Sequence, residues 1–244
     1  PIFDEMDNSS IGALAIADGN HNHVWAGTGE TFLIRPAHAN GNGIYKSTDG
    51  GKNWKNMGLK ETVRISKVIV DPSDTNTVYV AALGHAHGPQ QERGVYKTSD
   101  GGKSWNRILF VDENTGCSDL SINPKDPKNL VAAMWQVDIK TWNLNSGGLG
   151  SGFYKTVDGG KSWKQMKNGL PGGASHPVGK TSIDIAQSNP SVIYALVEDK
   201  APGLYKSTDA GESWKLMYES NSMAQRAPYY TRVRVSSQDE NKLY

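Results

Sequence analysis

One eight-residue segment occurs four times in this chain, each copy starting with Ser or Thr and ending with Trp. The copies are residues 47–54, 98–105, 156–163 and 207–214. Their aspartates, at positions 49, 100, 158 and 209, are 51, 58 and 51 residues apart. Spacings of this size are typical of propeller repeats built from four short strands. The repeat therefore constrains the fold more than any other feature of the sequence.

Each copy lies between two strand-like segments. An apolar and an aromatic residue, such as Ile44-Tyr45, precede it, and Trp-Lys or Trp-Asn closes it, so it predicts a strand, a tight turn and a second strand. The Asp can accept hydrogen bonds from N–H groups of its own turn, and a following Gly can supply a positive φ. Because Ala210 replaces the first glycine in the fourth copy, only the second glycine is expected to be essential.

The aspartates invite a metal-binding or catalytic interpretation, but four equivalent copies at one turn position indicate a structural role. The closing Trp is then expected to be an apolar plug beside or between blades. The residues assigned this structural role are Asp49, Gly51, Trp54, Asp100, Gly102, Trp105, Asp158, Gly160, Trp163, Asp209, Gly211 and Trp214.

The composition narrows the range of functions. The 244 residues carry a net charge of +1, so nothing favours nucleic acid as a partner, and no long apolar run predicts membrane insertion. The single cysteine, Cys117, excludes an internal disulfide and a multi-cysteine zinc site, and a buried apolar role is expected for it. No cofactor is predicted.

The repeats divide the chain into blades of a β-propeller. The fold class predicted is all-β, with four-stranded antiparallel blades at about residues 11–58, 63–109, 117–167 and 179–217, and an incomplete fifth at 231–244. Tyr244 occupies the place of Trp25, Tyr79 and Tyr194, in the middle of a second strand. Open blade edges are a liability, so residues 1–244 are expected to be a partial propeller whose remaining blades come from a longer chain.

The four repeated eight-residue segments should lie on the same face of the propeller as the turns between first and second strands. The longer connections are then expected on the other face. These are residues 27–43, 84–94, 135–152, 168–180 and 218–230, lengths that usually indicate function. Trp135 and Trp142 could be exposed platforms for ligands, or could simply cover the loop. The ligand-binding candidates on this face are His85, His87, Arg93, Trp135, Gln136, Trp142, Asn145, Arg226, Tyr229 and Tyr230.

The same face carries residues that could form a metal site or the arginine cluster of a sialidase. His85 and His87 could hold a metal together with Glu92, but a third ligand at fixed spacing is absent, so no metal is predicted. Arg35, Arg93 and Arg226 could form the arginine cluster of a sialidase. The string Phe32-Leu33-Ile34-Arg35-Pro36 departs from the motif of that family, which argues against a sialidase.

The repeat resembles the Asp-box, or bacterial neuraminidase repeat, in all four copies. Further segments resemble a family of secreted bacterial proteins with a sortilin-type propeller, often described as glycosyl-hydrolase-like. The resemblance implies a secreted or periplasmic location and a propeller of about seven to ten blades. The segments that carry it include Gly27-Thr28-Gly29-Glu30, Ala82-Leu83-Gly84-His85-Ala86-His87-Gly88-Pro89, Ala133-Met134-Trp135-Gln136, Asn145-Ser146-Gly147-Gly148 and Arg226-Ala227-Pro228-Tyr229-Tyr230-Thr231-Arg232.

Three functions remain open from the sequence. The first is a binding propeller that engages a polypeptide or glycan on the loop-rich face. The second is a glycoside hydrolase resembling the two-propeller xyloglucanases, which needs a pair of carboxylates; Glu30 and Glu92 are the first candidates. The third is a scaffold or assembly factor in a surface complex. The carboxylates considered on this face are Glu30, Glu61, Glu92, Asp112, Glu113, Asp138, Glu198 and Asp199.

Overall fold

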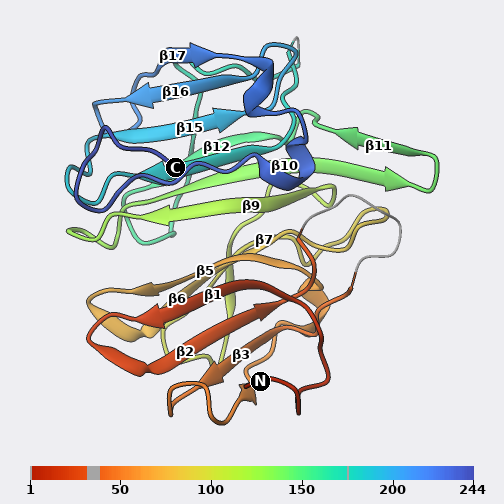
Figure 1. Cartoon of the computed structure of the whole chain (residues 1–244), viewed down its shortest axis with the longest axis vertical. Coiled ribbons are helices and arrows are strands. Elements are labelled where there is room, and N and C mark those ends of the chain that lie inside the picture. Colours follow the sequence, from red (N-terminus) through yellow and green to blue (C-terminus); the bar gives the residue numbers. More distant parts are fainter. Residues whose placement is uncertain (1, 32–38, 175) are drawn as a thin grey trace. The chain divides into compact units, whose positions relative to one another are not determined.

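The computed structural model describes residues 2–31, 39–174 and 176–244, and shows an all-β chain (Figure 1). Four antiparallel sheets follow one another along the sequence, each with four strands in sequential order and one with an additional strand. The predicted fold class is therefore confirmed. Arg35 lies outside the described residues. No helix in the described parts of the chain is both long and apolar enough to span a membrane.

The chain divides into two compact units, Pro1–Cys117 with Ile139–Thr141, and Ser118–Asp138 with Trp142–Tyr244. The first unit contains two sheets, blades 1 and 2, joined by the short 3₁₀ helix η1 (Lys60–Thr62). Blade 1 consists of β1 (Ile11–Ala17), β2 (Asn20–Thr28), β3 (Ile44–Ser47) and β4 (Lys55–Asn56). Blade 2 consists of β5 (Ile65–Asp71), β6 (Asp74–Ala82), β7 (Gly94–Thr98) and β8 (Asn106–Leu109).

Blades 3 and 4 belong mostly to the second unit. Blade 3 consists of β9 (Thr115–Ile122), β10 (Leu130–Lys140), β12 (Gly152–Thr156) and β13 (Lys164–Met166), with β11 (Asn143–Ser146) paired to the far end of β10. Blade 4 consists of β14 (Thr181–Ile185), β15 (Ile193–Val197), β16 (Gly203–Ser207) and β17 (Lys215–Glu219). After η2 (Asn221–Met223) and α1 (Ala227–Tyr230), a single bridge between Val235 and Leu243 begins a fifth sheet.

Hydrogen bonds to the carboxylate of the aspartate close each Asp-box turn. Asp49 Oδ1 accepts hydrogen bonds from the backbone N–H groups of Lys52 and Asn53 at 3.0 and 2.9 Å and from the Ser47 hydroxyl at 2.8 Å. Asp49 Oδ2 accepts one from Asn53 Nδ2 at 2.6 Å. Asp100, Asp158 and Asp209 have equivalent partners. A turn of five residues, 49–53, is thus closed by one side chain, which accounts for the aspartate in structural terms.

Both glycine positions of the box have left-handed backbone, which the sequence predicted only for the second. Gly51, Gly102, Gly160 and Gly211 have φ between 87° and 93°, whereas Ala210, at the first position, has φ of 56°. The latter value lies in the region that non-glycine residues can enter at moderate cost. A Cβ on Gly102 would also lie 2.8 Å from the Trp25 ring. The second glycine is therefore the more restricted position.

The box turns lie at the same end of each sheet as the first turn of that sheet. The N–H groups of Gly50, Gly101, Gly159 and Ala210 donate to the carbonyl oxygens of Asn22, Asn76, Lys128 and Ser191 at 2.9–3.0 Å. The predicted grouping of boxes and first turns is therefore confirmed. The connections between second and third strands emerge at the opposite end of each sheet; they are long in blades 1 and 2, and five residues join β15 to β16 in blade 4.

Apolar side chains fill the space between neighbouring blades within each unit. In the first unit Trp25, Ile44, Val68 and Val78 form one cluster, against which Trp105 packs. Trp105 meets Trp25 edge-to-face at 6.2 Å and donates from Nε1 to the Met57 carbonyl oxygen at 2.8 Å. In the second unit Trp214 packs in the equivalent cluster, which confirms the predicted role of these two closing indoles between blades. Cys117 is fully buried, as expected.

Replacement of Asp49 by alanine should destabilise blade 1 because four hydrogen bonds of the box turn lose their acceptor. We expect Asp49→Ala to lower the melting temperature by about 3–6 °C. Asp18→Ala, which removes an exposed carboxylate from another turn of the same blade, is the matched control and should change it by less than about 1 °C. Equal effects of the two substitutions in thermal unfolding would contradict a structural role.

The carboxylate of Asp49 should make the melting temperature depend on pH. Hydrogen bonds from the Asn53 side chain and backbone and from Ser47 lower the pKa of Asp49 to about 2, from 3.8 in the unfolded chain. A carboxyl with a depressed pKa contributes stability above its unfolded pKa and loses it as the pH falls towards its folded pKa. The difference in melting temperature between the wild type and Asp49→Asn should therefore be constant above about pH 4 and shrink between about pH 4 and pH 2. A difference independent of pH in this range would show that ionisation of Asp49 is not involved.

Candidate functional site

The connections of the second unit surround a cavity of about 340 Å³ at the end of the sheets opposite the box turns. Two acidic side chains, Glu198 and Asp199, line it directly after the end of β15. Ser146, the last residue of β11, and His176, from the connection between blades 3 and 4, complete its polar wall. Pro177, Gly179 and Lys200 are the remaining lining residues.

Glu198 is fixed by hydrogen bonds to one of its oxygens. Its Oε2 atom accepts from the Ser146 hydroxyl and from the backbone N–H of Lys180, both at 2.5 Å. A Cβ on Gly179 would lie 2.2 Å from this oxygen, so the carboxylate can approach the backbone only because residue 179 is glycine. Both of these hydrogen bonds are made to Oε2 and together fix the orientation of the carboxylate.

Asp199 is fixed by an imidazole. The two carboxylate oxygens lie 2.7 and 2.6 Å from His176 Nε2, and Oδ1 also accepts from the backbone N–H of Lys200 at 2.6 Å. The Asp199 side chain is nearly buried, whereas that of His176 is more than half exposed. The cavity therefore offers two preorganised carboxylates and one solvent-facing imidazole, groups that hydrogen-bond to hydroxyls.

A buried lysine lies behind the cavity, and nothing in the sequence indicated it. Lys180 Nζ donates to the Pro228 carbonyl oxygen at 2.9 Å and lies 5.6 Å from the centre of the Trp135 ring. Burial, with a smaller contribution from Arg232, lowers the pKa of Lys180 to about 8. Nearby, Arg234 donates two hydrogen bonds of 2.8 and 3.0 Å to the buried carboxylate of Asp119.

Trp135 is not an exposed platform, contrary to one of the two interpretations of its sequence position. Its side chain is 0% exposed, and its Nε1 donates to the Ser146 hydroxyl at 3.0 Å. The reason is that β10 continues past the expected end of the strand and pairs with β11, which places residue 135 inside a sheet rather than in a loop. Trp135 thus supports Ser146, which in turn holds Glu198.

Arg93 is also buried, so its direct contact with a ligand is not supported. Its Nη1 donates to the Leu83 carbonyl oxygen at 2.8 Å, and its Nη2 donates to those of His85 and Gly88 at 3.0 and 3.2 Å. A guanidinium has enough donors for all three carbonyl groups of this connection. Arg93 therefore closes the loop between β6 and β7.

The two histidines of that loop face different surroundings. His87 is exposed, and its Nδ1 lies 2.9 Å from the Ile139 carbonyl oxygen. His85 is partly buried, and burial together with the charges of Arg93 and Arg64 lowers its pKa. No group of three or more His, Cys, Asp or Glu side chains among the described residues could hold a metal ion.

The hairpin β10–β11 projects from blade 3 and carries Trp142 at its turn (Figure 1). Trp142 is 83% exposed, as one of the two interpretations expected. Gln136 accepts from the Gly150 N–H at 2.9 Å and so shapes the following turn, whereas Asn145 is exposed and accepts from the Asn143 side chain. An exposed indole therefore stands on the same hairpin that supplies Ser146 to the cavity.

The connection after blade 4 places its candidates around the helix α1. Arg226 precedes the helix and is exposed, and Tyr230 is exposed at its end. The rings of Tyr229 and Tyr230 lie 5.3 Å apart. Lys180 binds the carbonyl group of Pro228 within this helix. The segment is thus tied to the wall of the cavity, with one tyrosine facing solvent.

Glu30 and Glu92, the predicted catalytic candidates, have different neighbours within the first unit. Glu30 lies near Arg64, whose Nε donates to the Glu30 carbonyl oxygen at 2.9 Å. Glu92 lies near Tyr96, whose pKa is raised mainly by burial and in smaller part by this carboxylate. The catalytic role of the two groups therefore stays a prediction.

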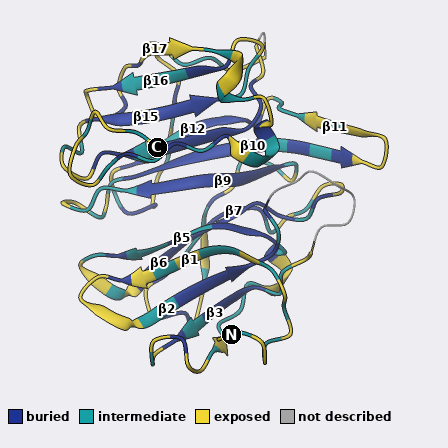
Figure 2. Cartoon of the chain, viewed as in Figure 1, coloured by how far each residue is buried: buried dark blue, intermediate teal, exposed yellow. Residues whose placement is uncertain are grey.

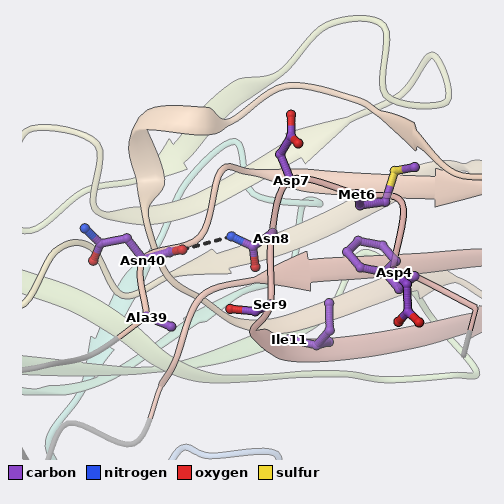
Figure 3. A pocket seen from close by; sticks show the side chains of 9 residues that line it. Asp4, Met6, Asp7, Asn8, Ser9, Ile11, Ala39 and Asn40 are labelled. Carbon is purple, nitrogen blue, oxygen red and sulfur yellow. Dashed lines mark hydrogen bonds between the residues drawn. The ribbon is translucent and has the colours of Figure 1, made fainter.

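A larger cavity, of about 750 Å³, lies beside the N-terminal segment of the first unit (Figure 3). Asn8 lines this cavity and donates from Nδ2 to the Asn40 carbonyl oxygen at 2.8 Å. Asp4 and Asp7 line this cavity, but their carboxylates point away from each other (Figure 3). The two described carboxylates of this cavity therefore do not converge as those of the smaller cavity do.

A family model described as "Sortilin, neurotensin receptor 3" matches residues 42–172, which is more than half of the chain. The chain belongs to this Sortilin-Vps10 family. Among curated proteins, a probable oligoxyloglucan-reducing end-specific xyloglucanase of Neosartorya fischeri is 23% identical over 86% of the chain. The corresponding enzyme of Emericella nidulans is 24% identical over the same share. The chain spans 27% of the length of each of these relatives.

Solved structures with the same fold include the GH74 xyloglucanase of Xanthomonas campestris, with a TM-score of 0.69 at 16% identity over 97% of the chain and 35% of the enzyme. YCF48 of Cyanidioschyzon merolae matches with a TM-score of 0.54 at 15% identity, over 89% of the chain and 59% of that protein. At these identities the likeness concerns the fold alone. It places this member of the Sortilin-Vps10 family among β-propellers.

The assignment of Arg93 to loop closure leads to a stability prediction. We expect Arg93→Lys to lower the melting temperature by about 5 °C or more. The three carbonyl oxygens are arranged around the two terminal nitrogen atoms of a planar guanidinium, and a single ammonium nitrogen cannot reach all of them. Hydrogen exchange of residues 84–94 should increase in this variant. Arg226→Lys, the same exchange at an exposed position after blade 4, is the control and should have little effect on the melting temperature. A variant with weakened ligand binding and unchanged stability would contradict the assignment.

Proposed function

We propose that the protein carrying this chain is a glycoside hydrolase that acts on a polysaccharide, and that the cavity lined by Glu198 and Asp199 binds one of its sugar residues. The observation that carries the proposal is the pair of adjacent carboxylates, each fixed by its own donors, in an open cavity. Carboxylates fixed in this way accept hydrogen bonds from sugar hydroxyl groups without reorganisation.

Aromatic side chains of the same unit support this proposal. Trp142 and Tyr230 are exposed, and their flat rings suit the apolar face of a pyranose. The cavity has room for a single sugar unit, so a longer substrate would continue over the neighbouring surface. The xyloglucanase relatives favour a β-glucan with side branches as the class of substrate.

Substrate binding and bond cleavage are assigned to different carboxylates in this proposal. Glu198 and Asp199 are already hydrogen-bonded within the protein, which suits them to hold a substrate. Glycoside hydrolysis needs a protonated carboxylic acid on one side of the bond and a carboxylate on the other. Glu30 and Glu92 remain the candidates for these roles, together with groups from the rest of a longer protein. Since a polysaccharide does not cross membranes, a secreted or periplasmic location follows from the proposal.

Binding and hydrolysis of xyloglucan oligosaccharides by the full-length protein test the proposal. We expect Asp199→Asn and Glu198→Gln each to weaken binding about 10- to 100-fold in titration calorimetry, because each removes a charged acceptor. Glu219→Gln, on the exposed strand β17, is the matched control and should bind as the wild type does. We expect Glu30→Gln or Glu92→Gln to abolish release of reducing ends without weakening binding.

Two outcomes would contradict these assignments. Unchanged affinity in both Asp199→Asn and Glu198→Gln would exclude the cavity as the sugar site. Binding without any release of reducing ends by the wild-type protein, across plant and microbial polysaccharides, would exclude the hydrolase and leave a glycan-binding propeller.

A further inference from the structure

Each of the four blades has a lysine directly before the Ser or Thr that begins its box. In three blades this lysine lies opposite an aromatic residue of the second strand, in the pairs Trp25–Lys46, Tyr79–Lys97 and Tyr194–Lys206. The ammonium groups lie over these rings, 4.8, 5.2 and 5.3 Å from the ring centres. The face of an aromatic ring attracts a cation in this position. A ring beneath the lysine is therefore part of the repeat.

Blade 3 has the lysine without the ring. Lys155 lies opposite Val131, which stands where the other blades have Trp or Tyr. The Lys155 Nζ atom donates to the Ala210 carbonyl oxygen of the next blade at 3.3 Å. Lys46 makes the equivalent bond to the Gly101 carbonyl oxygen at 3.5 Å. The cation thus keeps its place in blade 3, while the side chain opposite it is much smaller.

A cavity of about 290 Å³ lies at this position, between blades 3 and 4 of the second unit and at the box end of their sheets. Val131, Ile185 and Ile193 form part of its apolar wall, and Lys155 lines it as well. Val131 and Ile193 come from β10 and β15, strands that are buried over most of their length (Figure 2). An apolar cavity of about 150 Å³ is large enough to bind benzene. The cavity therefore has room for the ring that Val131 does not supply.

Other departures from the repeat gather at the same cavity. Val157 is 66% exposed and stands at a box position where the other copies have Thr or Ser. Glu212 stands where the other copies have Lys, and it forms ion pairs with Lys155 and Lys164. Both line the cavity, as does Ala210, which replaces the first box glycine. Four positions that differ from the repeat, with Val131, thus belong to one cavity.

The mouth of the cavity suits a polypeptide better than a free aromatic molecule. A ring alone would fill the interior and leave Val157 exposed at the rim. An aromatic side chain that enters from a polypeptide brings its backbone across the rim, where it covers Val157. The exposed side chains of Lys164 and Glu212 can hydrogen-bond to its peptide groups. Aromatic side chains that fill a pocket are also the usual anchors of protein interfaces.

From this geometry we propose that the cavity between blades 3 and 4 binds an aromatic side chain of a partner polypeptide, with the ring beneath the Lys155 ammonium group. The ring takes the place that Trp25, Tyr79 and Tyr194 occupy in their own blades. The proposal depends neither on the cavity lined by Glu198 and Asp199, at the other end of the sheets, nor on hydrolase activity.

Titration of the full-length protein with the peptide N-acetyl-Gly-Phe-Gly-amide, followed by ligand-observed NMR, tests this site. Peptides with alanine or cyclohexylalanine in place of phenylalanine are the matched probes. We expect the phenylalanine peptide to bind about 10-fold or more tightly than the alanine peptide, because its ring is buried. We expect it to bind about 3-fold more tightly than the cyclohexylalanine peptide, because only an aromatic ring attracts the ammonium group.

Two variants separate the cavity from the cation. Val131→Tyr supplies the ring of the other blades, so it should weaken binding of the phenylalanine peptide about 10-fold or more without lowering the melting temperature. Lys155→Met keeps an apolar stem and removes the charge, so it should abolish the preference for phenylalanine over cyclohexylalanine. Lys206→Met, the same exchange above the ring of Tyr194, is the control and should bind as the wild type does.

Four results would overturn the proposal. The first is equal binding, or no binding, of the phenylalanine and alanine peptides by the wild-type protein. The second is wild-type affinity in a folded Val131→Tyr variant. The third, which decides the matter if that variant does not fold, is an unchanged preference for phenylalanine over cyclohexylalanine in Lys155→Met. The fourth is binding of toluene as tightly as the phenylalanine peptide, which would show a site for free aromatic molecules.

Discussion

A blade of this protein has two apolar faces and can bury neither of them by itself. The interface between blades 1 and 2, in which Trp25 and Ile44 meet Val68, Val78 and Trp105, is the interaction on which the rest of the structure depends. Four strands with alternating side chains are too thin to form a core, so each blade becomes stable through its neighbours. Leu14 and Ile16 of blade 1, by contrast, are exposed.

The Asp-boxes occupy one end of the sheets, and the proposed sugar site lies at the other. The carboxylate of each box fixes a turn, and the backbone of that turn is joined to the first turn of the same sheet, as Gly50 is to Asn22. That end of the sheet is occupied by short, internally bonded turns. The long connections lie at the other end, where Glu198, Asp199 and His176 form the cavity of the second unit. The repeated aspartates thus fix turns at only one end of the sheets, and the connections at the other end can differ in length and sequence.

The fold followed from the sequence because its determinants are local and repeated. The Ser/Thr, Asp and Gly of each box lie within five residues of one another, and the turn they form sets the strands on either side. The site was less predictable because its contacts join distant residues. His176 reaches Asp199 across 23 residues and Ser146 reaches Glu198 across 52, so the sequence could name Glu198 and Asp199 as candidates without showing what fixes them. The sequence left two interpretations of Trp135 open, an exposed platform or a loop cover. Its burial could not be predicted because the pairing of β10 with β11 places it in a sheet where a loop was expected.

Hydrogen exchange of the full-length protein with and without a saturating xyloglucan oligosaccharide would show which end of the sheets binds the ligand, because it reports on both ends in one experiment. We expect slower exchange at residues 143–150, 176–180 and 198–201, around the cavity of the second unit. We expect no change at the box turns, residues 47–54, 98–105, 156–163 and 207–214. Protection confined to the box turns, with the cavity segments unaffected, would contradict the division between structural turns and functional loops.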